Sequence, residues 1–171
     1  MFGNGAKAGG PNYVAGLGSW TPKNELDPTA AGKSYRTWWK TTFSQEHDPS
    51  GLTGESNHFR YVPIKRLGVL AAPDTPQVEL ELVQTAAAVA GISLIVVYSP
   101  EEMIAQLPNI ERVRALSQPS EQLLRAAQDQ HVPLIQEPLS ADGRLELRYY
   151  LRGQAISETQ HRYGNLVEKI G

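Results

Sequence analysis

The sequence contains no cysteine among its 171 residues. A chain without thiols can form no disulfide, no thiolate zinc site and no cysteine nucleophile. It also lacks a surplus of positive charge, because 16 Lys and Arg stand against 18 Asp and Glu, for a net charge of −2. The phosphate neutralisation that dominates nucleic-acid affinity therefore has no evident source, and we expect no nucleic-acid partner.

Long hydrophobic runs are also missing. The longest mainly apolar run covers residues 92–98, whereas a membrane span needs about 20 such residues. Residues 1–7 have neither the apolar centre of a secretory signal nor the arginine-rich character of a transit peptide. We therefore expect no membrane span and no export, and the absence of cysteine agrees with a cytoplasmic location.

The chain is long enough for one domain that buries roughly 70% of its unfolded surface. Its composition changes near Lys65, where a glycine- and aromatic-rich first third gives way to an aliphatic remainder. We therefore divide the sequence into residues 1–64, a loop and an aromatic helix, and residues 65–171, a second domain that ends in a strand.

The second region alternates between short apolar runs and helical patterns. Strands are expected at 67–71, 92–98, 113–116 and 132–135, and helices between them. The run at 92–98 is nearly unbroken, which is typical of a strand covered on both faces of a parallel sheet. Parallel strands joined by helices favour right-handed crossovers. The predicted fold class is therefore α/β, with a small Rossmann-like parallel layer and helices on both faces.

Helix boundaries in this region carry recognisable signals. Thr75 is expected to cap the first helix, and Gly91 to end it. Ser99 is expected to cap the next helix, with Glu102 completing a capping box. A further helix is predicted after Gly143, and a terminal strand over residues 155–163.

The first region contains an aromatic helix. Between about residues 28 and 45, the aromatic side chains fall on one helical face: Tyr35, Trp38, Trp39 and Phe43. Such a stripe normally packs against a core. Because the neighbouring residues offer little other core, we expect Trp38, Trp39 and Phe43 to form an interface with a partner outside this chain.

Motifs for catalysis or ligand binding are incomplete. Ala31-Gly32-Lys33-Ser34 resembles the end of a phosphate-binding loop, but Asp27 stands where the pattern needs a glycine. Residues 71–75 lack the glycine fingerprint of dinucleotide-binding folds. The four histidines show no metal-ligand spacing, and no serine lies in a G-x-S-x-G elbow. The residues thus predict no catalytic group, no metal site and no cofactor bound by this chain.

Two sets of residues resemble a known family. The sequence AKAGGPNYV at 6–14 is similar to a loop near the C-terminus of L-glutamate γ-semialdehyde (1-pyrroline-5-carboxylate) dehydrogenases, within the aldehyde dehydrogenase superfamily. HDPSGLTGESNHFRY at 47–61, with GRLEL at 143–147 and the stretch 150–165, resembles the C-terminal extension of bifunctional proline utilisation A enzymes. Together the resemblances reach from one end of the chain to the other.

The resemblance implies a role in proline catabolism. The family oxidises proline with a flavin domain and then oxidises the semialdehyde to glutamate with NAD and a catalytic cysteine. This sequence contains neither the flavin domain nor the NAD-binding domain with its catalytic cysteine. The resemblance therefore implies that the chain is the detached C-terminal part of a larger, oligomeric enzyme whose missing domains would precede Met1. NAD, and FAD where the flavin domain belongs to the same polypeptide, would be bound by the rest of that enzyme, which is the expected partner.

The resemblance also implies site residues. Backbone amides of Ala8, Gly9 and Gly10 would hold the α-carboxylate of the substrate, with Lys7 nearby, because glycines let amides converge on an anion. The stretch FGNG at 2–5 differs from the serine-glycine-threonine sequence usual in the family, which removes a hydroxyl. The terminal strand would add to a sheet of another domain or subunit, with Arg162 and Tyr163 at the join.

Two other functions fit the same residues. A free-standing interaction or regulatory module would bind a partner through the aromatic face. An independent nucleotide-binding protein is disfavoured by the absent glycine fingerprint.

Overall fold

The computed structural model describes residues 26–48, 55–159, 161–162 and 165–166. The chain forms two compact units. We call the described residues within Lys23–Trp39 and Pro63–Arg152 the sheet unit, and the described residues within Lys40–Val62 and Gly153–Gly171 the ribbon unit. These boundaries differ from a division at Lys65, because the helix at Pro28–Trp38 packs within the sheet unit.

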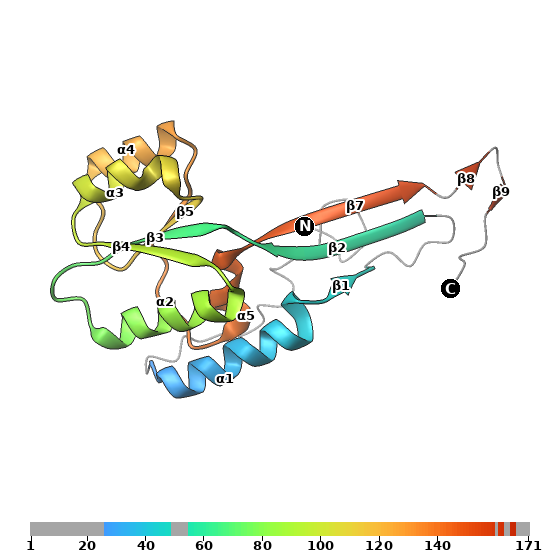
Figure 1. Cartoon of the computed structure of the whole chain (residues 1–171), viewed down its shortest axis with the longest axis horizontal. Helices are drawn as coiled ribbons and strands as arrows, with labels where there is room; N and C mark the ends of the chain where they lie inside the picture. Colours follow the sequence, from blue (N-terminus) through green and yellow to red (C-terminus); the bar gives the residue numbers. More distant parts are fainter. Residues whose placement is uncertain (1–25, 49–54, 160, 163–164, 167–171) are drawn as a thin grey trace, which may run out of the picture. The chain divides into compact units, whose positions relative to one another are not determined.

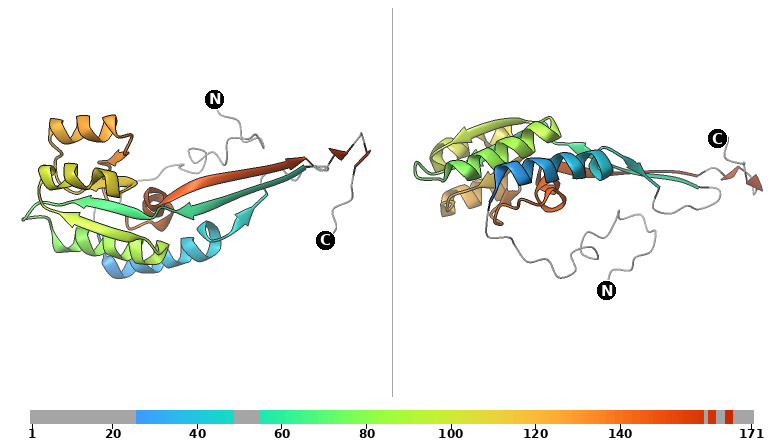
Figure 2. Two further views of the ribbon diagram at one scale, coloured as in Figure 1. Left: turned by 45° about the horizontal axis from the view of Figure 1, so that its top comes forward. Right: turned by 90° about the horizontal axis from the view of Figure 1, so that it is seen from below.

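The sheet unit is built on a four-stranded parallel sheet in the order β4-β3-β5-β6. Its strands are β3 (Arg66–Leu70), β4 (Ser93–Val97), β5 (Arg112–Ala115) and β6 (Leu134–Ile135). Figures 1 and 2 show helices on both faces of this sheet. They are α1 (Pro28–Trp38) and α2 (Gln77–Ala90) on one face, and α3 (Pro100–Gln106) and α4 (Glu121–Asp129) on the other. The predicted α/β class with a parallel layer is confirmed.

Local signals in the sequence account for several helix ends. Gly91 follows α2 with φ of 71°, a left-handed conformation that glycine adopts without a steric penalty. The Ser99 side chain accepts a hydrogen bond from the Glu102 amide at the start of α3, as predicted. The Glu102 carboxylate, however, accepts from the amide of Tyr98 rather than of Ser99, so the capping box is shifted by one residue.

The start of α2 differs from the prediction. Thr75 does not cap this helix, whose N-cap is Pro76 and which has no side-chain cap. The Thr75 hydroxyl instead accepts a hydrogen bond of 2.7 Å from the amide of Ala72. A local turn before the helix therefore takes the oxygen that the sequence pattern assigned to the cap.

The prediction that residues 92–98 form a strand covered on both faces is wrong in one respect. The strand is present as β4, but it lies at the edge of the sheet and only Val97 within it is buried. An uninterrupted apolar run indicates a strand without indicating its place in the sheet order. Tyr98, directly after it, is 54% exposed.

Apolar side chains fill the space between the sheet and α3 and α4. Gly68 of β3 makes this packing possible, because a Cβ there would come within 2.6 Å of Ile110 Cδ1 and 2.9 Å of Met103 Sδ. The buried residues of this cluster are Leu70, Val97, Met103, Leu107, Ile110, Val113, Leu123 and Ala127. Ile110 follows a single 3-10 turn, η3 (Leu107–Asn109).

The sheet unit closes with α5 (Gly143–Glu146) and the 3-10 turn η4 (Leu147–Tyr150). The predicted helix after Asp142 is therefore present but short. Asp142 caps it by accepting a hydrogen bond from the amide of Arg144 at 2.9 Å. Among the described residues, no helix has both the length and the apolar character that crossing a membrane requires.

The ribbon unit contains a three-stranded sheet in the order β1-β2-β7. Its strands are β1 (Glu46–His47), β2 (Glu55–Pro63) and β7 (Leu151–Thr159), and Figure 2 shows β2 and β7 running in opposite directions. A separate pair joins β8 (His161–Arg162) to β9 (Asn165–Leu166). The expected terminal strand exists as β7, but it pairs with β2 of its own chain, so it needs no other domain or subunit for its first partner.

Candidate functional site

The carboxyl edge of the parallel sheet is the usual ligand site in open α/β folds, at the point where neighbouring strands connect in opposite directions. The strand order places that point between β3 and β5. Backbone groups at this edge bond to one another. Leu116 N, after β5, donates to Leu70 O of β3 at 2.8 Å, and on the other side of β3 Ala71 N donates to Val97 O of β4 at 2.9 Å.

The loop between β3 and α2 offers little to a phosphate. The amide of Ala72 donates to Thr75 Oγ1, and the amide of Thr75 donates back to Ala72 O at 3.0 Å. Pro76, at the N-cap of α2, has no N–H to donate. A dinucleotide-binding turn aims such amides at a pyrophosphate, whereas these amides bond within the loop. That the chain itself holds no NAD stays a prediction.

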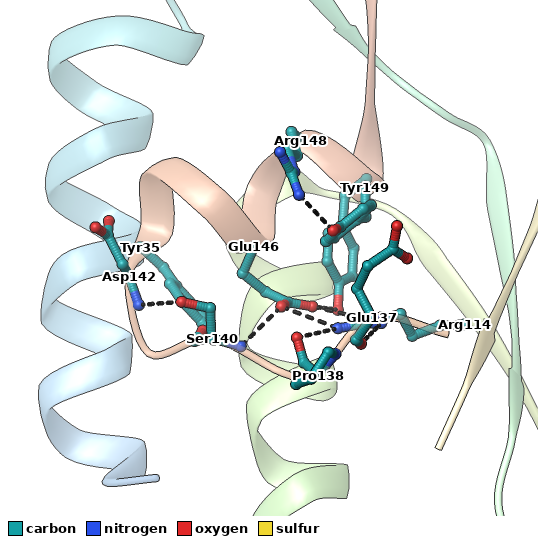
Figure 3. A network of polar contacts seen from close by, with 10 residues as sticks. Tyr35, Arg114, Glu137, Pro138, Ser140, Asp142, Glu146, Arg148 and Tyr149 are labelled. Atoms are coloured by element: carbon teal, nitrogen blue, oxygen red, sulfur yellow. Dashed lines mark hydrogen bonds and ion pairs between the residues drawn. The ribbon is translucent and has the colours of Figure 1, made fainter. Parts of the chain in front are cut away.

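A buried ion pair joins β5 to α5 in the sheet unit (Figure 3). The side chains of Arg114 and Glu146 are both 0% exposed. Arg114 Nη2 lies 3.1 Å from Glu146 Oε2, and its Nε lies 3.2 Å from Oε1, so the contact is bidentate. Arg114 also donates to the carbonyl oxygens of Glu137, at 2.6 Å, and Pro138, at 3.4 Å. The guanidinium group of Arg114 thus donates hydrogen bonds to one carboxylate and two main-chain carbonyl oxygens.

Two tyrosines complete this network. Tyr150 Oη donates to Glu146 Oε1 at 3.2 Å, and Tyr35 Oη donates to the carbonyl of Ser140 at 2.6 Å. The amide of Ser140 donates to Glu146 Oε2 at 3.0 Å. Burial, and secondly the negative charge of Glu146, raise the pKa of both tyrosines well above the ordinary value. Both hydroxyls therefore stay protonated and act as donors.

Hydrogen bonds of this network join α1 to the segment around α5 in the sheet unit. Besides the Tyr35 bond, Ser34 Oγ accepts a hydrogen bond of 2.9 Å from the amide of Gly143. A Cβ on Gly143 would lie 2.8 Å from Ser34 O and from Tyr35 Cα, so only glycine allows this close approach of α1 and α5. Since its members are buried and bonded to one another, the cluster has a structural role: it holds the polypeptide, and presents no group to a ligand.

The sequence contained a signal for this network. Arg114 stands between Val113 and Ala115 in an apolar strand, and a charge in such a place needs a buried counter-ion. The partner, Glu146, lies 32 residues away along the chain. Periodicity could not identify it.

The aromatic residues predicted as an interface have different surroundings. Phe43 is buried and makes an edge-on contact with Tyr61 within the ribbon unit, with ring centroids 4.9 Å apart. Trp38 and Trp39 are half-buried, and Arg144 lies over the Trp38 ring at 5.4 Å. The α-helix ends at Trp38 and a π-helical turn, η2 (Trp39–Phe43), follows, so the stripe expected from a constant helical period is interrupted. Of the three interface candidates, only the tryptophans keep exposed surface.

Most of the other predicted site residues lie outside the part of the chain that the structure describes. Ala8, Gly9, Gly10 and the neighbouring Lys7 lie outside the described residues, as do Tyr163 and the side chain of Arg162. The backbone of Arg162 pairs with Asn165 in the β8–β9 pair. The binding of the substrate carboxylate by the first three residues, and the contact of Arg162 and Tyr163 with another domain or subunit, therefore stay predictions.

Polar side chains on the ribbon unit form an open chain of contacts. Ser56 Oγ and His58 Nε2 lie 2.6 Å apart, and His58 Nδ1 lies 3.7 Å from Glu46 Oε1. The second separation is too long for a hydrogen bond, and both side chains are exposed, so water competes for them. His58 is therefore an exposed side chain that is hydrogen-bonded to Ser56. Within the described ranges, no cluster of three or more potential metal-ligating side chains occurs.

The surface of β7 is open in the described part of the chain. Its residues from Gly153 to Glu158, which belong to the ribbon unit, are all exposed, and Ile156 is 42% exposed. Arg60 Nε of β2 donates to Gln154 Oε1 of β7 at 2.7 Å. A small sheet with so little burial is marginal by itself in water.

Comparisons with known proteins find similarity to a solved structure. No protein-family model matches this chain, and no curated protein does. Among solved structures, the chain is similar to Proline Utilization A (PutA) from Corynebacterium freiburgense, with a TM-score of 0.66 and 32% sequence identity. The match covers 96% of this chain and 18% of that chain. The chain thus spans less than a fifth of the length of the PutA chain, and nearly all of its own length is similar to part of that chain.

Proposed function

We propose that this chain is the C-terminal part of a bifunctional proline utilisation A type enzyme. In that enzyme it would be a non-catalytic part of the NAD-dependent L-glutamate γ-semialdehyde dehydrogenase. The observation that carries the proposal is the extent of the likeness, which covers 96% of this chain at 32% identity rather than a single motif. The reaction itself would be carried out by the remaining length of the enzyme.

The chemistry of the chain supports a non-catalytic role. Oxidation of an aldehyde by this family needs a thiolate to form a thiohemiacetal, and the sequence has no cysteine. The amides at the carboxyl edge of the sheet bond within the protein. NAD and FAD would therefore be held by the other domains, in the cytoplasm.

Two contributions to the complete enzyme follow from this assignment. Ala8, Gly9 and Gly10 would present amides to the substrate carboxylate. The ribbon unit would contact another domain or subunit and support oligomerisation or sealing, for which its exposed β7 surface is suited. β7 retains one edge without a partner strand among the described residues, so pairing with β2 leaves room for a second partner.

Substitution of the anchor glycines tests the first contribution. The experiment uses a chimera in which this chain replaces the matching part of PutA from Corynebacterium freiburgense. Replacing Gly9 with valine should raise the KM for the semialdehyde about ten- to a hundredfold, because a Cβ would displace amides from a charged group whose hydrogen bonds contribute about 1.5–3 kcal/mol. The KM for NAD should stay within about twofold.

The matched control is Gly18→Val, which makes the same change outside the anchor in the same segment. It should leave both KM values unchanged. Equal damage to the two substrates by Gly9→Val would contradict the anchor, and a chimera without any semialdehyde oxidation would contradict the proposed function.

One observation favours a second candidate, a free-standing interaction module. Tyr35 and Phe43 are buried within this chain, so these two aromatic residues need no outside partner. The half-buried Trp38 and Trp39 would be the part of the aromatic face through which the module binds. Such a module would bind a protein without altering semialdehyde oxidation, which separates it from the first candidate.

A further inference from the structure

The outer edge of β4 has no partner strand among the described residues. Within the described part of the chain, β4 pairs with β3 alone, and Figure 1 shows it at the border of the sheet. Ser93 N donates to Lys65 O at 3.3 Å, and Val97 O accepts from Ala71 N at 2.9 Å, so both ends of β4 bond toward β3. Because bonding alternates along a strand, the N–H and C=O groups of Leu94 and Val96 point toward the free edge.

This edge has none of the usual protection against pairing. Exposed edge strands usually carry lysine, proline or a bulge that prevents contact with another strand. The sequence of β4, SLIVV, has no charge and no proline. Its three central side chains are half-exposed. An uncharged edge strand rich in β-branched residues is suited to pairing with a second strand.

We propose that β4 pairs antiparallel with β4 of a second copy of this chain. A twofold axis beside Ile95 would set Leu94 opposite Val96 of the partner subunit. The outward N–H and C=O groups of these residues would then bond in both directions, giving a closed and symmetric pair. The two four-stranded sheets would become one continuous sheet.

Charge favours this orientation and this occupant. Lys65 and Arg66, both exposed, lie beside the Ser93 end of β4. Glu101 and Glu102, also exposed, follow its other end. Antiparallel pairing brings the basic end of one copy to the acidic end of the other, whereas parallel pairing would place like charges together. The chain thus supplies its own complementary partner.

The inference goes beyond the proposed function, because it uses the sheet unit alone and a surface other than the ribbon unit. It therefore stands or falls independently of the enzyme assignment.

Disulfide trapping with the full chain tests the pairing. Ile95 would face itself across the axis as a non-hydrogen-bonded pair, with Cα atoms about 4.5 Å apart, within reach of a disulfide. Since the natural sequence has no cysteine, Ile95→Cys introduces the only thiol. Under mild oxidation this variant should become a covalent dimer, whereas Leu124→Cys, at an exposed apolar position of α4, should stay largely monomeric.

A second variant tests the same pairing without a disulfide. Leu94→Lys should raise the dimer dissociation constant at least about tenfold in sedimentation experiments, since two lysines would enter the paired edge. Leu124→Lys is the matched control and should leave the constant unchanged, with circular dichroism confirming that both variants fold. A wild-type chain that stays monomeric at all concentrations would overturn the proposal, as would equal cross-linking of Ile95→Cys and Leu124→Cys, or equal effects of the two lysines.

Discussion

Replacing Glu146 with glutamine should lower the free energy of unfolding by about 3–5 kcal/mol, because it leaves the charge of Arg114 buried without a counter-ion. Both side chains are 0% exposed, so water cannot compensate. Glutamine keeps nearly the same volume, which restricts the change to charge and hydrogen bonding. Urea denaturation measures the effect as a shift in midpoint with an unchanged slope.

The sheet unit offers a matched control on its surface. Glu121 and Arg125 form an ion pair on α4 with side chains 86% and 79% exposed. Glu121→Gln should change the free energy of unfolding by no more than about 0.5 kcal/mol. Adding Arg114→Met to Glu146→Gln should restore part of the loss, since it removes the uncompensated charge. Equal effects of Glu146→Gln and Glu121→Gln would contradict the buried network.

Gly143→Ala should destabilise the chain by about 1–3 kcal/mol, through overpacking rather than charge. The added Cβ would lie 2.8 Å from Ser34 O and from Tyr35 Cα, which are backbone atoms that cannot rotate away. Helices α1 and α5 would have to separate, and the hydrogen bond from Gly143 N to Ser34 Oγ would lengthen. Thermal or urea unfolding measures the loss.

Gly32→Ala is the control for that substitution, because Gly32 is also buried and lies on α1. Its nearest contact for a Cβ is Thr85 Cγ2 at 3.4 Å, and the position is inside a helix, where alanine is favoured over glycine by about 1 kcal/mol. Gly32→Ala should therefore be neutral or stabilising. If the two alanine variants have the same stability, the close contact between α1 and α5 is wrong.

Local chemistry explains what the sequence could predict of the fold. Gly91 ends α2 and Ser99 caps α3 because these signals depend on a few neighbouring residues. The alternation of apolar runs and helical patterns was sufficient for the parallel layer. The edge position of β4 was not predictable in this way, because sheet order depends on contacts between distant segments.

Longer-range features were missed for the same reason. The pairing of β2 with β7 brings Arg60 and Gln154 together across 94 residues. The π-helical turn at Trp39–Phe43 shifts Phe43 toward Tyr61, which a constant helical period cannot anticipate. For the candidate site, family resemblance supplied the anchor at Ala8, Gly9 and Gly10, which lies outside the described residues and remains a prediction.

Recovery of enzyme activity by the separate chain tests the central claim most directly. PutA from Corynebacterium freiburgense would be truncated to remove the part that matches this chain, and NADH formation from the semialdehyde would be followed with and without the chain added. We predict that the chain alone forms no NADH, that the truncated enzyme is impaired, and that a stoichiometric addition restores semialdehyde oxidation. A truncated enzyme whose activity is unaffected by the loss, or is not increased by the added chain at any concentration, would contradict the account.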